Sequence, residues 1–332
     1  MKHTLAVVSF VVTIIVTANL VSSRAQESTN TTTSPTHNWA QGNPLKIAQL
    51  KWYQANVVPT SFVVGKTNNS NPYGLAFDGQ NIWTANKGEG SVTKIRTSDG
   101  AVLGNFDVGG NPNGVVFDGA NVWVTASPDT ITKLRASDGK PLGSFTVGGA
   151  PWWPAFDGQN IWVPNFSDGT LSKLRASDGK TLGTFTESGA IAAAFDGEAV
   201  WVTNYGPNTV TKVRPSDGKV LGAFPVGQAP IGVAFDGANV WVANQADQTV
   251  TKLRASDGKT LGTFNVPGLP YGLAFDGANI WVTGLYVVEL RASDGARVGW
   301  FSSRDLLNST GVAFDGANIW VALGLGNTVL KF

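Results

Sequence analysis

Hydrophobic and polar positions repeat along most of this chain with a period close to 40 residues. The motif Phe-Asp-Gly-x-x-[Ile/Val]-Trp first appears at Phe77 to Trp83 and returns six more times. Its phenylalanines, 39 or 40 residues apart, are Phe77, Phe117, Phe156, Phe195, Phe235, Phe275 and Phe314. Its tryptophans are Trp83, Trp123, Trp162, Trp201, Trp241, Trp281 and Trp320. Spacing this even indicates a repeat architecture rather than two unrelated domains.

Each repeat is predicted to contain four short β-strands. In the unit from Ile231 to Val266, runs rich in Val, Ile, Thr, Phe and Trp alternate with clusters of Gly, Asp, Asn and Ser. The four runs are 232–235, 240–244, 249–254 and 260–266. This alternation is typical of strands joined by tight turns, and no run has the 3.6-residue period of a helix.

A four-stranded unit of this kind cannot bury both of its faces alone. Packing seven such units around an axis buries them against one another, so the sequence predicts an all-β, seven-bladed β-propeller of four-stranded antiparallel blades. The residue before each motif Phe is Ala or Val, which suits an innermost strand crowded at the axis. The repeated Phe and Trp are suited to filling the space between blades.

The two ends of the repeat region predict how the ring closes. The last copy reaches Phe332 after three strands, whereas the segment before the first copy, 61–65, resembles a fourth strand. We therefore predict that strand 61–65 pairs with strand 328–332. The propeller domain accordingly spans 61–332.

The segment before the propeller predicts export. Residues 1–25 have a short polar start, an apolar stretch from Leu5 to Val21 and small residues before a cleavage point, as in a signal peptide. A retained membrane anchor is the alternative. With a signal peptide, the mature protein is expected to be secreted, periplasmic or at the cell surface, without further contact with a membrane.

Two further segments separate this leader from the ring. Residues 26–43 are polar and Thr-rich, which predicts a disordered linker. Residues 44–60 are predicted to form a helix and its connection, because Pro44 suits a first helical position. This helix is expected to cover part of the ring or to bind a partner.

Composition excludes several classes of function. The net charge is +1 and the 24 basic residues are dispersed, so no nucleic-acid partner is expected. The chain has no cysteine, and its only histidines, His3 and His37, precede the repeats. A zinc site or a Ser-His-Asp triad within the ring is therefore excluded. No cofactor is expected, and the ring is expected to be a monomer.

Charges that recur in every repeat are predicted to be structural. The aspartates of the Phe-Asp-Gly and Ser-Asp-Gly motifs suit tight turns, where a carboxylate accepts hydrogen bonds from the local backbone. The Thr-Lys-x-Arg strands are expected to point their charged side chains to solvent.

Positions at which the repeats differ are the candidates for function. Four residues before each motif Phe, the mouth of the central channel should be ringed by Tyr73, Asn113, Trp152, Ile191, Ile231, Tyr271 and Thr310. Only the third repeat follows this residue with another tryptophan, Trp153. The candidate ligand-binding residues are Trp152, Trp153, Tyr73, Asn113, Tyr271, Tyr205 and Glu187. Aromatic platforms of this kind suit a small molecule, a glycan or a protein side chain. The alternative is that the two tryptophans simply plug the channel.

The repeated motifs resemble those of a known group of propellers. Phe-Asp-Gly-x-Asn-[Ile/Val]-Trp-Val, Thr-Val-Thr-Lys-Leu-Arg and Ser-Asp-Gly-Lys-x-Leu-Gly, over 61–332, are similar to secreted bacterial YVTN/NHL-type repeats and to the virginiamycin B lyase superfamily. The resemblance implies a seven-bladed ring. The lyases use a histidine base beside a glutamate-held magnesium ion; this sequence has no histidine after His37, so no lyase residue is carried over.

Three functional hypotheses follow, of which the third is a surface structural protein with no small ligand, indicated by a plugged channel and the lack of a concave polar pocket. The first is a secreted binding protein that uses the channel mouth. The alternative is a metal-dependent lyase or hydrolase acting through acidic residues outside the repeated turns, namely Glu89, Asp129, Asp168, Glu187, Asp247 and Asp305. Two or more of these carboxylates would then have to converge on one face.

Overall fold

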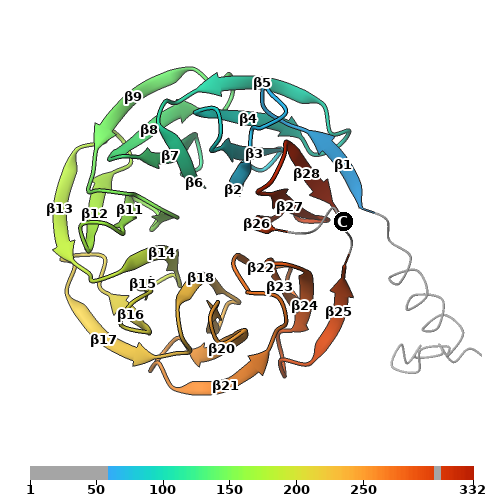
Figure 1. The fold of residues 1–332 in the computed structure, drawn as a ribbon. Coiled ribbons are helices and arrows are strands. Elements are labelled where there is room, and N and C mark those ends of the chain that lie inside the picture. Colours follow the sequence, from blue (N-terminus) through green and yellow to red (C-terminus); the bar gives the residue numbers. More distant parts are fainter. Residues whose placement is uncertain (1–58, 303–307) are drawn as a thin grey trace, which may run out of the picture. The chain divides into compact units, whose positions relative to one another are not determined.

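The structure, a computed structural model, describes residues 59–302 and 308–332. The predicted signal peptide, the predicted linker and residues 44–58 of the predicted helix and connection lie outside the described residues. The described strands form seven separate four-stranded sheets, arranged as blades around a central axis (Figure 1). The predicted seven-bladed propeller is confirmed. No helix in the described ranges is long and apolar enough to cross a membrane.

Six blades take their strands consecutively, from the axis outward. Blade 1 contains β2 (Pro72–Phe77), β3 (Asn81–Asn86), β4 (Ser91–Arg96) and β5 (Val102–Asp107). Blade 2 contains β6 (Asn111–Phe117), β7 (Asn121–Ser127), β8 (Thr130–Arg135) and β9 (Pro141–Thr146). Blade 3 contains β10 (Ala155–Phe156), β11 (Asn160–Asn165), β12 (Thr170–Arg175) and β13 (Thr181–Thr186).

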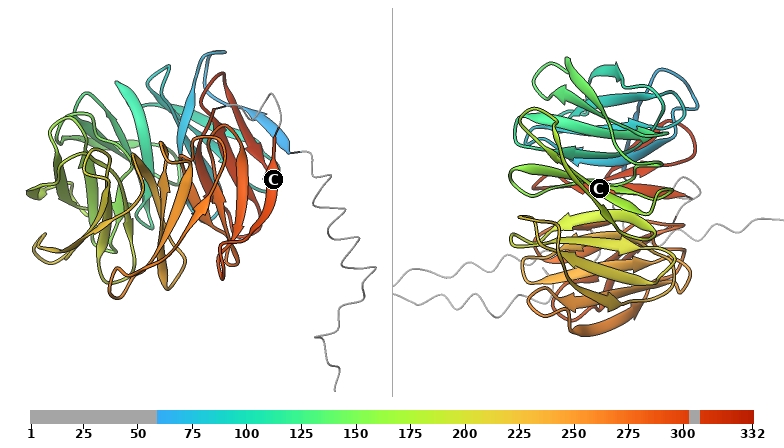
Figure 2. Two further views of the ribbon diagram at one scale, coloured as in Figure 1. Left: turned by 60° about the horizontal axis from the view of Figure 1, so that its bottom comes forward. Right: turned by 90° about the vertical axis from the view of Figure 1, so that its left-hand side faces the viewer.

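The next three blades follow the same order, and Figure 2 shows their turns at both faces of the ring. Blade 4 contains β14 (Ala190–Phe195), β15 (Val200–Asn204), β16 (Thr209–Val213) and β17 (Val220–Pro225). Blade 5 contains β18 (Pro230–Phe235), β19 (Asn239–Asn244), β20 (Thr249–Arg254) and β21 (Thr260–Asn265). Blade 6 contains β22 (Leu273–Phe275), β23 (Asn279–Val282), β24 (Val287–Arg291) and β25 (Arg297–Phe301).

Blade 7 joins the two ends of the ring. Its strands are β26 (Ser309–Phe314), β27 (Ile319–Leu323), β28 (Thr328–Lys331) and β1 (Thr60–Val63). β1 pairs antiparallel with β28, with Thr60 opposite Lys331 and Val63 opposite Thr328. The predicted closure is confirmed, although β1 ends before Gly65. That residue has a φ of 75°, a left-handed conformation that suits glycine and turns the chain out of the strand.

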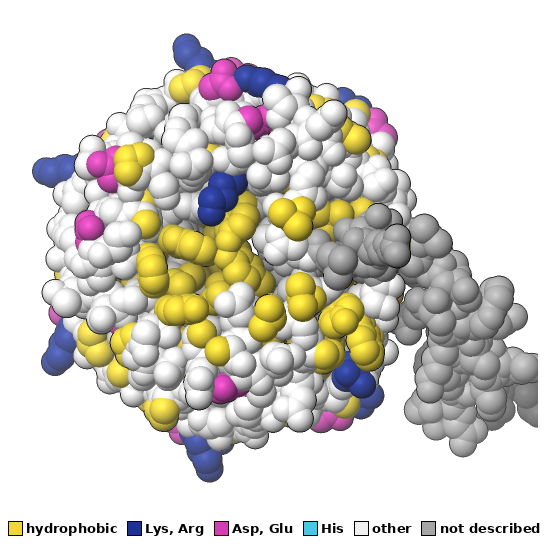
Figure 3. All heavy atoms as spheres, in the orientation of Figure 1, with side chains coloured by type: hydrophobic (Ala, Val, Ile, Leu, Met, Phe, Trp, Pro, Cys, Tyr) yellow, Lys and Arg dark blue, Asp and Glu magenta, His cyan; other side chains and the backbone are white. Residues whose placement is uncertain are grey.

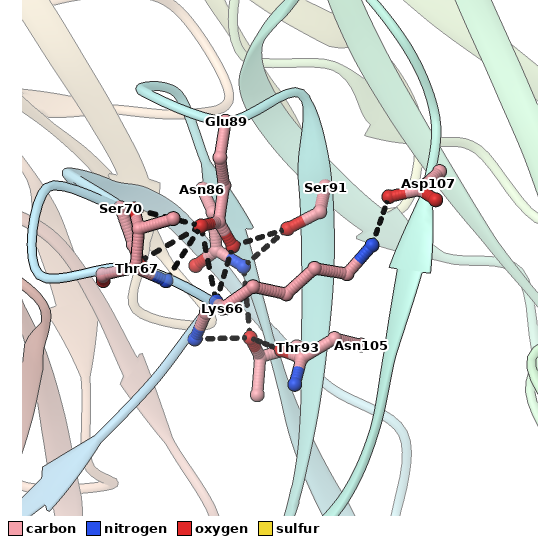
Figure 4. Close-up of polar contacts among 10 residues, drawn as sticks. Lys66, Thr67, Ser70, Asn86, Glu89, Ser91, Thr93, Asn105 and Asp107 are labelled. Atoms are coloured by element: carbon pink, nitrogen blue, oxygen red, sulfur yellow. Dashed lines mark hydrogen bonds and ion pairs between the residues drawn. The ribbon is translucent and has the colours of Figure 1, made fainter.

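Glu89 fixes the loop that follows β1. Its carboxylate accepts hydrogen bonds from the backbone N–H groups of Lys66 and Thr67, at 2.8 and 3.1 Å (Figure 4). The hydroxyls of Ser70 and Ser91 also donate to it, at 3.2 and 2.7 Å. Burial alone would raise the pKa of Glu89, but these hydrogen bonds lower it below its usual value. A carboxylate of blade 1 thus holds the strand that completes blade 7.

The hydrophobic core lies between neighbouring blades, with the motif tryptophan at its centre. Trp83, for example, is fully buried among valines of blades 1 and 2. Its indole N–H donates to Asp78 Oδ2 at 2.7 Å, while Oδ1 accepts from the backbone of Asn81 at 2.6 Å. Each of the seven repeats has this Trp–Asp bond. The motif aspartate therefore shapes the turn, as predicted, and also anchors the buried indole.

The lysines of the third strands correct an expectation. Lys94 is 6% exposed, and its ammonium lies 5.2 Å from the ring centroid of Trp83 and donates to Ala136 O of the next blade at 2.6 Å. Equivalent bonds between neighbouring blades are made by Lys133, Lys173, Lys212, Lys252 and Lys331. These side chains lie between blades, where they satisfy carbonyls, rather than in solvent. Only the arginines of these strands face outward and pair with Ser-Asp-Gly aspartates.

Candidate functional site

Four aromatic side chains meet at the mouth of the central channel. They are Tyr73 of blade 1, Trp152 and Trp153 of blade 3, and Tyr271 of blade 6, and we call them the mouth cluster. The ring centroid of Tyr73 lies 5.9 Å from that of Trp152, and the Trp153 centroid lies 5.2 Å from that of Tyr271. All four side chains are only partly buried. Figure 3 shows hydrophobic side chains gathered at the centre of this face, with a basic side chain at the border.

A left-handed residue precedes the mouth position in several blades. Ala150, Ala229 and Leu269 have φ values of 51°, 53° and 55°, and each is followed by a proline and then by the mouth residue. A non-glycine residue in this region costs roughly 1–2 kcal/mol. The surrounding sheet must therefore impose the turn, and the turn fixes where each mouth side chain leaves the backbone.

The two tryptophans of blade 3 differ in their backbone pairing: the Trp152 N–H still donates to Pro164 O of β11 at 2.9 Å, whereas Trp153 leaves the sheet of its own blade. Proline has no N–H to donate, so Pro154 interrupts the ladder and β10 is only two residues long. Trp153 pairs instead with blade 4: its N–H donates to Ile191 O at 3.1 Å, and its carbonyl accepts from Ala193 at 3.0 Å.

The side chain of Trp153 reaches from blade 3 to blades 2 and 6. Its indole N–H donates to Asn113 O of blade 2 at 3.3 Å, and its ring is perpendicular to that of Tyr271. Beyond it the channel contains a cavity of about 140 Å³, lined mostly by glycine and aliphatic side chains of the inner strands. Trp153 lines this cavity and also belongs to the mouth cluster. Trp153 therefore occupies the position that the plug alternative requires, whereas Trp152 does not line the cavity.

The two tyrosine hydroxyls of the cluster are hydrogen-bonded to each other. Burial raises the pKa of Tyr73, although the hydrogen bond from Tyr271 opposes the shift. Burial, followed by the proximity of Tyr73, raises the pKa of Tyr271 strongly. Both phenols therefore stay neutral near neutral pH and act as apolar surfaces with a polar edge.

Asn113 lies beneath the mouth cluster rather than on its surface. The side chain is 1% exposed and donates to Ser127 Oγ and to Pro151 O, both at 3.1 Å. Its Oδ1 atom has no hydrogen-bond partner in the structure. Asn113 thus supports the segment that carries Trp152.

Tyr205 forms a separate exposed pair. It packs edge-on against Phe166, with ring centroids 6.0 Å apart, and these residues are 37% and 39% exposed. Both follow the asparagine that ends a second strand. Neither ring is in aromatic contact with the mouth cluster among the described residues.

Glu187 is buried in the framework. It is 7% exposed, and the Asn204 side-chain amide donates to its Oε1 at 2.8 Å. Burial raises its pKa, against the opposing effect of hydrogen bonds from Thr211 and Asn204. Equivalent asparagines of other blades donate to hydroxyls of the third strand in the same way. Glu187 therefore extends a repeated structural hydrogen-bond network.

Lys87 is a member of the site that is not among the seven candidate ligand-binding residues, although it lies in a connection between second and third strands whose residues vary from repeat to repeat. It follows Asn86 at the end of β3, and its Nζ atom lies 4.6 Å from the ring centroid of Tyr73 and 5.6 Å from that of Trp152. The residues in the equivalent positions are Phe166, Tyr205 and Gln245. Lys87 is the charged member of that set, which is the signal that could have identified it.

Four of the six candidate acidic residues are engaged in separate hydrogen bonds, and Asp305 lies outside the described residues. Asp168 accepts from Gly149 N at 2.6 Å and Asp247 from Gln228 N at 2.7 Å, so each holds a connection between blades. The carboxylates of Glu89 and Glu187 accept the hydrogen bonds described above. Within residues 59–302 and 308–332, no group of three or more His, Cys, Asp or Glu side chains is placed to hold a metal ion.

Comparison with known proteins identifies the fold. No protein family and no curated protein matches the sequence. Among solved structures, a streptogramin B lyase (TM-score 0.71, 17% identity) aligns over 82% of this chain and 97% of its own. Virginiamycin B lyase from Staphylococcus aureus (TM-score 0.70, 17% identity) aligns over 82% and 98%. U3-55K (TM-score 0.72, 13% identity) aligns over 82% and 97%. The chain has the propeller fold that its resemblance to the virginiamycin B lyase superfamily implied.

Proposed function

We propose that this protein is a binding protein that takes a small, largely apolar ligand on the mouth cluster. The observation that carries the proposal is the meeting of four partly exposed aromatic side chains from blades 1, 3 and 6 at one point. The propeller does not need them there, since the same position is filled by isoleucine in blades 4 and 5 and by threonine in blade 7.

Aromatic rings in this arrangement suit flat or aliphatic ligands. Offset and edge-on contacts with a ring contribute about 0.5–1.5 kcal/mol each beyond the apolar area they bury. Trp152 offers its ring at the surface, and Trp153 forms the floor. Because Trp153 belongs to the mouth cluster and also lines the cavity of the channel, the proposed ligand lies in the mouth above it.

The proposal includes export, which rests on the apolar segment from Leu5 to Val21. The alternative of a metal-dependent lyase or hydrolase is not adopted, because the described carboxylates hold connections between strands and do not meet in the mouth. The names of the similar solved structures do not decide the matter, since identity below 20% supports the fold alone.

The test uses saturation-transfer NMR with neutral probes: indole-3-acetamide, benzamide and methyl β-glucoside. Trp152→Ala should abolish the signal of at least one probe that the wild-type protein binds. Trp300→Ala is the matched control, because Trp300 is 50% exposed on the outer strand of blade 6. The absence of any signal with the wild-type protein, or equal loss in both variants, would overturn the proposal.

A further inference from the structure

Lys87 places a positive charge at the border of the mouth cluster. It lies in the connection between β3 and β4, on blade 1, and reaches toward Trp152 on blade 3. The side chain is partly buried against Tyr73 and Trp152. The position of the ammonium is therefore set by the same two rings that form the proposed binding surface.

The ammonium of Lys87 has no hydrogen-bond acceptor among the described residues. The six third-strand lysines give the contrast: each lies over a tryptophan ring and also donates to a carbonyl of the next blade, as Lys133 does to Ala176 O at 2.7 Å. Lys87 has aromatic neighbours but no such carbonyl. The nearest acidic residue in sequence, Glu89, is occupied by the loop after β1 and forms no ion pair with it among the described residues.

A partly desolvated ammonium with unused N–H groups favours an anionic partner. Burial lowers the pKa of Lys87, so its charged form lacks the compensation that water or a carboxylate would give. A hydrogen bond between two charged groups is roughly twice as strong as one between neutral groups. The rings beneath contribute cation–π attraction but accept no conventional hydrogen bond.

The geometry points to a small apolar carboxylic acid as the ligand class: we propose that Lys87 receives the carboxylate while the apolar body lies against Trp152 and Tyr271. This inference rests on the proposed function, because it names the chemistry recognised at the same site. Trp153 limits the depth of the mouth, which favours a compact body such as a single aromatic ring system over a long chain.

The experiment compares three probes that share one ring system and differ in charge: indole-3-acetate, indole-3-acetamide and tryptamine. Isothermal titration calorimetry should give a dissociation constant about tenfold lower for indole-3-acetate than for the amide, and weaker binding still for tryptamine. Added salt should weaken the binding of indole-3-acetate and leave the binding of indole-3-acetamide nearly unchanged.

Lys87→Met should remove the preference for the acetate, so that the variant binds the acetate and the amide with equal affinity. Lys140→Met is the matched control, because Lys140 is an exposed lysine of a Ser-Asp-Gly hairpin, and the preference should persist in it. A peptide ending in tryptophan, with a free or an amidated carboxyl end, distinguishes a chain terminus from a free acid as the source of the carboxylate.

Equal affinity for the acetate and the amide, or a preference for tryptamine, would overturn this inference while leaving the proposed function in place. Failure of all three indole probes to bind the wild-type protein would overturn it as well. The proposed function fails separately, through the neutral-probe test with Trp152→Ala.

Discussion

Phe62 of β1 stacks on Trp320 of β27, with ring centroids 5.3 Å apart and an interplanar angle of 30°. The same phenylalanine covers Gly100 of blade 1, where an added Cβ would lie only 1.8 Å from its ring. Other blades repeat this arrangement; Phe106, for instance, packs on Trp83 and covers Gly139 of blade 2. The closing strand therefore reproduces with its side chain the contact that the outer strands of blades 1 to 5 make.

Removal of this side chain should loosen the closure of the ring. Phe62→Ala is expected to lower the free energy of unfolding by about 3 kcal/mol, the lower end for a buried phenylalanine, because the ring is partly exposed. Hydrogen exchange should accelerate first in β1 and β28. Val63→Ala is the control, since Val63 is 65% exposed on the same strand. Equal effects of the two substitutions would contradict the role given to Phe62.

A second prediction concerns pH and Glu289. In blade 6 this residue replaces the third-strand lysine; it is 7% exposed, and no described residue donates a hydrogen bond to it. Burial, and to a lesser extent Asp276, raises its pKa. A carboxyl whose pKa is raised by folding favours the folded state at low pH, and that contribution is lost as the pH rises through the folded pKa. Glu289→Gln should therefore stabilise the protein at neutral pH, by about 1 kcal/mol, in urea unfolding.

The difference between Glu289→Gln and the wild type should shrink as the pH falls toward about 4. Glu89 supplies a control of opposite sign. Its lowered pKa stabilises the fold above its unfolded pKa, and this contribution is lost as the pH falls through the folded pKa. Glu89→Gln should thus be less stable than the wild type at neutral pH. Changes of the same sign in the two variants would show that at least one assignment is wrong.

The third prediction separates the floor of the mouth from its surface. Trp153→Ala should join the 140 Å³ cavity to the mouth and lower stability by about 3–5 kcal/mol. Because the lost indole leaves an apolar space of its own shape, free indole should raise the melting temperature of this variant in a concentration-dependent way. Trp300→Ala opens no cavity, so free indole should not raise the melting temperature of this variant. If indole does not change the melting temperature of Trp153→Ala, the position given to Trp153 between the mouth and the cavity is wrong.

The sequence predicted the ring because its signal is repeated. Seven Phe-Asp-Gly motifs and the offset strand at 61–65 fix the number of blades and their closure without any knowledge of contacts. The aspartates, too, behave as turn residues, since that chemistry is local. The strands of the unit at Ile231 to Val266 lie within two residues of their predicted bounds.

Features that depend on neighbouring blades were harder to predict. The third-strand lysines were expected in solvent because strand alternation does not reveal that blade 2 offers a carbonyl to Lys94. Lys87 was not selected because its contact with Trp152 joins blades 1 and 3. Glu187 was a candidate because the sequence does not show that its carboxylate accepts a hydrogen bond from the Asn204 amide. In each case the deciding partner lies far away in the chain.

The lysine-to-carbonyl bond has an evolutionary consequence. Each bond takes its donor from one blade and its acceptor from the next, as Lys133 and Ala176 do, so it belongs to a neighbouring pair. If a unit among blades 1 to 5 were duplicated or deleted, each new junction would still bring the lysine of one blade to the acceptor carbonyl of the next. Glu289 breaks the series at the junction of blades 6 and 7, beside the blade built from both ends of the repeat region. The lysine-to-carbonyl contact is therefore interchangeable among the units of blades 1 to 5, whereas the junction of blades 6 and 7 requires its own partners.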